Sequence, residues 1–140
     1  MLGALLISMT LVACGESAQD KAKREVCGAR TEISKQITKL QALTPSSSAV
    51  NEAKSSLEVI SKELKKIKDA QHDLAPARRE QVEPATKTFE SELKAIASSV
   101  AASLSGGLES ALKNAGAQLK SALSKLANSY KQSLAPISCS

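Results

Sequence analysis

The chain has 140 residues, about the length of one domain, and its 19 basic and 14 acidic residues give a net charge of +5. Phe89 and Tyr130 are its only aromatic residues, and His72 is its only histidine. This composition excludes a metal site built from several histidines and an aromatic platform for stacking nucleic-acid bases. We therefore expect no nucleic-acid partner and no bound metal.

Residues 1–13 read MLGALLISMTLVA, an uncharged and largely apolar run. The run is too short to cross a membrane as a helix, which takes about 20 apolar residues, and it has the length of the apolar part of a signal peptide. It leads into Leu11-Val12-Ala13-Cys14, which resembles the lipobox of bacterial lipoproteins. The first basic residue, Lys21, comes later than in most signal peptides. The alternative interpretation is a buried N-terminal helix in which Cys14 is an ordinary cysteine.

The lipobox resemblance implies that residues 1–13 are removed as a signal peptide and that Cys14 carries a diacylglycerol. Each buried methylene of such acyl chains contributes about 0.8 kcal/mol to membrane binding, and two or more chains give stable anchoring. The protein would then be a small extracytoplasmic lipoprotein, held by palmitate-type chains on the cell membrane or on the periplasmic side of an envelope membrane. We expect residues 14–22 to be the lipidated cysteine with a flexible tether, and residues 23–140 to be the folded domain.

Once Cys14 carries lipid, Cys27 and Cys139 remain as an even pair in an oxidising compartment. Neither has the spacing of a metal ligand, so we expect a disulfide between the start and the end of the domain. It would close a loop of about 110 residues, which the chain-entropy model values at about 4–5 kcal/mol. The alternative is two unrelated thiols.

From Lys21 onward the apolar residues recur three or four positions apart, which predicts helices. Breaks at residues 44–48 (TPSSS), 74–76 (LAP) and 105–107 (SGG) divide the chain into four segments of roughly 23 to 28 residues, about 35–42 Å long. Pro84 either kinks the third segment or marks its start, and Pro136 ends the fourth. The apolar stripes consist of Val26, Ala29, Ile33, Ile37, Leu40 and Leu43; Val50, Ala53, Leu57, Ile60, Leu64, Ile67 and Leu74; Val82, Ala85, Phe89, Leu93, Ile96, Val100 and Leu104; and Leu108, Leu112, Ala115, Leu119, Leu123 (or Ala122), Leu126, Tyr130 and Leu134.

Four segments of matched length with short connections predict an all-α fold, an antiparallel four-helix bundle. The number of helices bears on the expected disulfide. With an even number of antiparallel helices, Cys27 and Cys139 lie at the same end and can meet, whereas three helices would separate them by about 40 Å.

Candidate catalytic or metal-binding groups are few. Asp69 and His72 have the carboxylate–histidine spacing of carboxylate-bridged di-metal bundles, but those sites need two such motifs. The pair also falls beside polar residues at the end of the second segment, where a solvated face is the ordinary explanation. We therefore expect no catalytic residues, no metal and no cofactor, and we expect the protein not to be an enzyme.

Charge is distributed unevenly along the chain. Beyond Glu109 there are no acidic residues, and of the lysines that follow, Lys113, Lys120 and Lys131 are spaced to share one helix face. This stripe suggests binding to anionic lipid or an acidic cell-wall polymer, against the simpler explanation that exposed lysines serve solubility. A second basic cluster is formed by Lys62, Lys65, Lys66 and Lys68.

Three functions remain open from the sequence. The first is a non-catalytic structural or protein-interaction role in the bacterial cell envelope. The second is electrostatic binding of an anionic lipid or wall polymer. The third is a carrier or sensor that binds a small apolar ligand in an aliphatic core with few rings.

Overall fold

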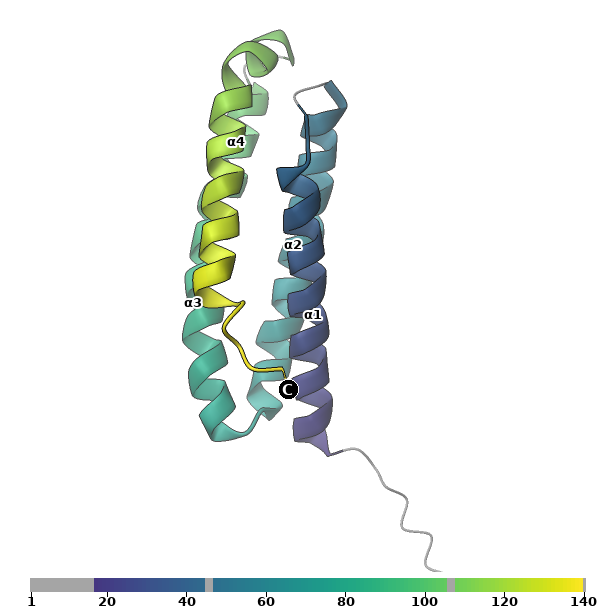
Figure 1. Ribbon diagram of the computed structural model, residues 1–140, viewed down its shortest axis with the longest axis vertical. Helices are drawn as coiled ribbons and strands as arrows, with labels where there is room; N and C mark the ends of the chain where they lie inside the picture. The colour runs from purple at the N-terminus through teal and green to yellow at the C-terminus, as the bar shows by residue number, and fades with distance from the viewer. Residues whose placement is uncertain (1–16, 45–46, 106–107, 140) are drawn as a thin grey trace, which may run out of the picture.

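The computed structural model describes residues 17–44, 47–105 and 108–139, and within its helices the side chains of Ser47, Val50 and residues 102–119 are outside that description. Its elements are α1 (Ala18–Gln41), α2 (Ser47–Ala70), the single 3-10 turn η1 (Gln71–Asp73), α3 (Pro76–Ser105) and α4 (Leu108–Ser133). The described part of the chain is all helical, and its long helices lie side by side (Figure 1). The expected all-α class and the four helical segments are confirmed.

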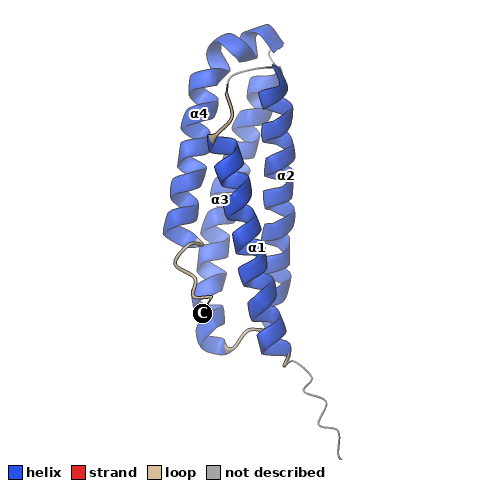
Figure 2. Cartoon of the chain, turned by 45° about the vertical axis from the view of Figure 1, so that its right-hand side comes forward, coloured by secondary structure: helices blue, strands red, loops and turns tan. Residues whose placement is uncertain are grey.

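The long helices surround a single core. Each packs against the helix that precedes or follows it in sequence, and α4 also packs against α1. The end of α1 and the start of α2 lie at one end of the molecule, together with the end of α3 and the start of α4 (Figures 1 and 2). The start of α1, η1 and the last described residues lie at the opposite end.

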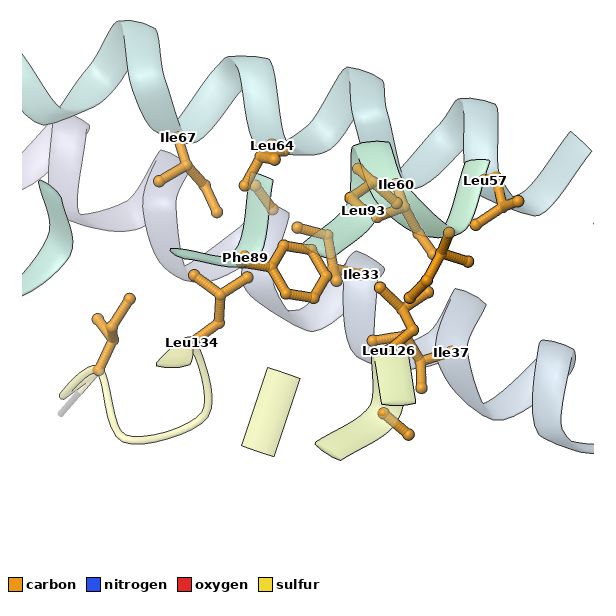
Figure 3. Packing of buried hydrophobic residues seen from close by; sticks show 14 of the residues in the cluster. Ile33, Ile37, Leu57, Ile60, Leu64, Ile67, Phe89, Leu93, Leu126 and Leu134 are labelled. Atoms are coloured by element: carbon orange, nitrogen blue, oxygen red, sulfur yellow. The ribbon is translucent and has the colours of Figure 1, made fainter. Parts of the chain in front are cut away.

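The core consists mainly of the predicted aliphatic stripes. Phe89 is completely buried, and Figure 3 shows its ring among side chains from the other helices, including Ile33 of α1 and Leu64 of α2. Burying a side chain of this size stabilises the fold by about 1.5–3 kcal/mol. The buried cluster is Ala22, Val26, Ala29, Ile33, Ile37, Leu40, Ala53, Leu57, Ile60, Leu64, Ile67, Ala70, Leu74, Val82, Phe89, Leu93, Ile96, Val100, Leu123, Leu126, Ala127, Leu134 and Ile137.

The first helix begins earlier than expected. The boundary between tether and domain was placed at residue 23, but α1 starts at Ala18 and Ala22 is buried in the core. Ser17 provides the reason, because its hydroxyl oxygen accepts a hydrogen bond of 3.1 Å from the backbone N–H of Asp20 and so caps the helix. The carboxylate of Asp20 also lies in the first turn, where the helix dipole favours negative charge. Residues 18–22 therefore belong to the folded domain.

Pro84 lies inside α3, which starts at Pro76 and continues through it. A proline at this position cannot donate to the carbonyl of Glu80, and its ring crowds that carbonyl. Both residues are on the exposed side of the helix, where water can bind the carbonyl that loses its partner. On the buried side of the same turn, Val82 and Thr86 pack into the core, and the Thr86 hydroxyl donates a hydrogen bond of 2.7 Å to the Val82 carbonyl.

Candidate functional site

Cys27 on α1 and Cys139 beyond α4 form a disulfide. Their Cα atoms are 5.7 Å apart, and the two residues are separated by 112 positions in sequence. The structure thus contains the pairing expected from the sequence. A Cα separation of this size is typical of disulfides. The bond joins the first helix to the end of the described chain. The C-terminal end of the chain lies at the end of the molecule where α1 starts (Figure 2).

The segment that carries Cys139, residues 135–139, is held down by arginines, and we call it the C-terminal strap. Arg30 of α1 donates to the carbonyl of Ala135 at 3.2 Å and also to that of Ile137. Arg78 of α3 donates to the carbonyl of Ser138 at 2.8 Å. Hydrogen bonds from charged donors are stronger than neutral ones, so the strap is fixed by contacts to two helices besides the disulfide.

Asp69 lines a hollow with Glu25, Glu32 and Glu63, and His72 is not among the residues that line it. Both side chains are exposed, Asp69 near the end of α2 and His72 in η1. The His72 carbonyl accepts a hydrogen bond of 2.5 Å from Arg79, which gives the turn a structural contact. Within the described residues, no group of three or more histidine, cysteine, aspartate or glutamate side chains is placed to hold a metal ion.

The lysine stripe predicted on the last helix is described in part. Lys120 and Lys131 are exposed on α4, eleven residues apart and therefore on one face. The side chain of Lys113 and the whole of Cys14 lie outside the described residues, so those predictions stay predictions.

A groove of about 870 Å³ lies between α2 and α3, and we call it the α2–α3 groove. Its floor is apolar and its rim is mainly basic, with five lysines against two glutamates. A volume of this size falls within the range of about 300–1,000 Å³ typical of small-molecule sites. The groove is lined by Lys54, Leu57, Glu58, Ser61, Lys62, Leu64, Lys65, Lys68, Glu90, Leu93, Lys94, Ala97, Val100 and Ala101.

Glu90 of α3 neutralises part of this rim. Its carboxylate accepts from Lys68 of α2 at 2.9 Å and from Lys94 one helical turn away at 3.2 Å. The hydrogen bonds from Lys68 and Lys94 lower the pKa of Glu90 below its ordinary value. The pair between Lys68 and Glu90 is also a polar contact between α2 and α3 at one end of the groove.

The remaining basic residues of the rim lack such a partner. Among the described residues, Lys54, Lys62 and Lys65 make no ion pair, and all are exposed. Glu58 lies on the same side of α2 but is not bonded to any of them. The groove therefore combines an apolar strip with lysines that can still bind an anion.

The sequence predicted the components of this groove but not the groove itself. Lys62, Lys65 and Lys68 belong to the basic cluster noted above, and Leu57, Leu64, Leu93 and Val100 to the core stripes. These residues form one groove only because of the distance between α2 and α3. The periodicity of the sequence does not encode that distance. Lys94 was missed, because on its own helix it is one charged residue on an exposed face.

No family model, curated protein or solved structure matches this chain. In the part of the chain that the structure describes, none of the helices combines the length and the apolar character needed to span a bilayer.

Proposed function

We propose that this chain is a lipid-anchored, extracytoplasmic protein of the bacterial cell envelope that acts by binding and has no catalytic role. Its domain would be an antiparallel four-helix bundle attached to the membrane through acyl chains on Cys14. The observation that carries the binding role is the α2–α3 groove, an apolar strip with a basic rim. Apolar surface bordered by polar residues is typical of interaction sites.

Two features support the proposed compartment. The sequence Leu11-Val12-Ala13-Cys14 resembles a lipobox, and the disulfide between Cys27 and Cys139 is of a kind that persists in oxidising compartments. The start of α1 and Cys139 lie at the same end of the molecule, so an anchor joined to α1 would leave the opposite end pointing away from the membrane (Figure 1). The groove, which runs along the sides of α2 and α3, would then open sideways, toward partners or ligands next to the membrane surface.

The intact mass of the protein purified from its own membrane fraction tests the anchor. We expect the loss of residues 1–13, the added mass of a diacylglycerol on Cys14, and a gain of two hydrogen masses on reduction. A full-length chain without lipid and with free thiols would overturn the proposed location. Crosslinking in intact cells then tests the interaction role, and failure to recover any reproducible partner would count against a protein-docking function.

A second candidate function is electrostatic binding of an anionic lipid surface or wall polymer through α4. The exposure of Lys120 and Lys131 on one face, in a segment with no acidic residue beyond Glu109, favours it. Sedimentation with anionic vesicles or wall preparations is the test. Replacing Lys113, Lys120 and Lys131 together by glutamine should reduce binding, and unchanged binding would exclude this function.

A further inference from the structure

We propose that the α2–α3 groove binds a single-chain anionic amphiphile, a molecule with one acyl chain and one anionic headgroup, of which a long-chain fatty acid is the simplest. This inference deepens the binding role proposed above and rests on it.

The groove has the length of an acyl chain with its headgroup. On α2 it runs from Lys54 to Lys68, which at 1.5 Å per residue corresponds to about 21 Å. One leaflet of the hydrocarbon core of a bilayer is about 15 Å thick, which is the reach of a typical acyl chain. From Lys65 to Lys54 the groove measures about 16 Å, so a headgroup held beside Lys62 and Lys65 leaves the length of one acyl chain toward Lys54.

The floor presents little accessible apolar surface to a helix from a protein partner. Leu57 and Val100 are each 7% exposed and Leu64 is 3% exposed, so most of the accessible apolar surface comes from the small side chains of Ala97 and Ala101. Only a thin strip of apolar surface is therefore accessible at the bottom of the groove. A docking helix is about 10 Å across with its side chains and needs a broader apolar face, whereas a single acyl chain is far thinner.

The rim provides a site for the headgroup. Lys62 and Lys65 are three residues apart on α2, so their side chains are neighbours on the helix surface. Neither makes an ion pair among the described residues, in contrast to Lys68 and Lys94, which Glu90 engages. A carboxylate or phosphate would bind between Lys62 and Lys65. The acyl chain would then run over Leu57 and Val100, toward the end of the groove where Lys54 lies.

Isothermal titration of the disulfide-bonded chain with palmitate, below the concentration at which palmitate self-associates, tests the proposal. We expect one palmitate per chain and weaker binding as salt is raised, because salt screens the lysine–carboxylate attraction. Hexadecanol has the chain without the charge, and acetate has the charge without the chain. Both should bind at least tenfold more weakly.

Matched charge variants locate the site. The double variant Lys62→Gln/Lys65→Gln should weaken palmitate binding about tenfold. The control variant Lys21→Gln/Lys39→Gln removes the same charge from exposed positions on α1, away from the groove, and should leave binding unchanged. Glu90→Gln should tighten binding a few-fold, because it releases Lys68 and Lys94 to face the ligand.

A variant that fills the floor tests the acyl-chain part of the site. Ala97 is exposed and lines the groove, so Ala97→Phe should abolish palmitate binding without changing the melting temperature. Three results would overturn the proposal: no palmitate binding, equal loss in the two double-lysine variants, or equal affinity for palmitate and hexadecanol. Binding of phosphatidylglycerol vesicles with no binding of free palmitate would also overturn it and would indicate a membrane-facing surface.

The experiments distinguish a failure of the proposed membrane anchor from a failure of the proposed amphiphile site. Loss of palmitate binding would leave the anchor on Cys14 untouched, since the intact mass tests the anchor. A chain without lipid that still binds palmitate would remove the proposed location and keep the groove as a ligand site.

Discussion

The two aromatic rings of the chain, Phe89 of α3 and Tyr130 of α4, contact each other edge to face, with their centroids 6.3 Å apart and their planes at 76°. Such pairs contribute about 0.5–1.5 kcal/mol beyond the burial of their area. The Tyr130 hydroxyl also reaches the carbonyl of Arg30 on α1, at 3.4 Å. The pair therefore links three of the helices in a core that is otherwise aliphatic.

Phe89→Ala should lower the free energy of unfolding by about 3–5 kcal/mol, because it removes the largest wholly buried side chain and leaves a cavity. Urea denaturation measures the change. Tyr130→Phe is the control, since it keeps the ring and removes only the long hydroxyl contact, and should cost no more than about 1 kcal/mol. Equal effects of the two substitutions would show that Phe89 is not central to the core.

Replacing both Cys27 and Cys139 by alanine should lower the free energy of unfolding by about 2–5 kcal/mol, since the bond closes a long loop in the unfolded chain. Thermal unfolding with and without reductant measures the loss. Reductant should destabilise the wild-type chain to a similar extent and leave the double variant unchanged. A double variant as stable as the wild-type protein would mean that the bond constrains little.

The lowered pKa of Glu90 predicts how the stability depends on pH. A carboxyl whose pKa is lower in the folded state contributes stability above its ordinary pKa, and the contribution is lost as the pH falls through the lowered value. Because the ion pairs with Lys68 and Lys94 are partly exposed, the contribution should be below about 1 kcal/mol. The wild-type chain should exceed Glu90→Gln in stability at pH 7 and match it well below pH 4.

Urea unfolding of both proteins across that pH range, at low and high salt, supplies the measurement. The difference should shrink at 1 M salt, because salt screens charges at the surface. A difference that persists at low pH would assign the effect to packing of the side chain and not to its charge.

Pro84→Ala should raise the free energy of unfolding by about 1–3 kcal/mol, because alanine restores the backbone donor to the Glu80 carbonyl within α3. The exposure of Pro84 means that no packing is lost. Denaturant unfolding checks the sign, with Pro76→Ala as the control, since proline is well tolerated at the first position of a helix. A loss of stability in Pro84→Ala would show that α3 needs the proline for its path.

Most of the fold follows from residue spacing. The stripe from Ala53 to Ile67 on α2 is buried as its three- and four-residue steps predict, and the pairing of Cys27 with Cys139 agrees with an even number of helices. The break at Leu74-Ala75-Pro76 also falls between α2 and α3. These features depend on local periodicity and on strong helix-breaking residues, which a single sequence contains.

Other features depend on balances that spacing does not encode. The start of α1 at Ala18 depends on a cap by Ser17, and a small polar residue near a terminus is compatible with either a cap or a tether. The continuation of α3 through Pro84 depends on tertiary packing that offsets the local cost. The α2–α3 groove depends on the distance between two helices. From the sequence alone, its lysines are typical of a solvated helix face and its leucines of a core.

The disulfide also determines how the molecule carries mechanical load. Cys27 lies in the third turn of α1 and Cys139 follows α4, so the bond turns the residues between them into a covalent ring. A pull applied between the segment before Cys27 and the chain after Cys139 passes through the two sulfur atoms and bypasses the ring. The tension would act on the part of α1 before Cys27, which includes the core residues Ala22 and Val26, whereas the rest of the core and the α2–α3 groove would bear none of it. A force applied through a ligand bound in the groove would instead act directly on α2 and α3.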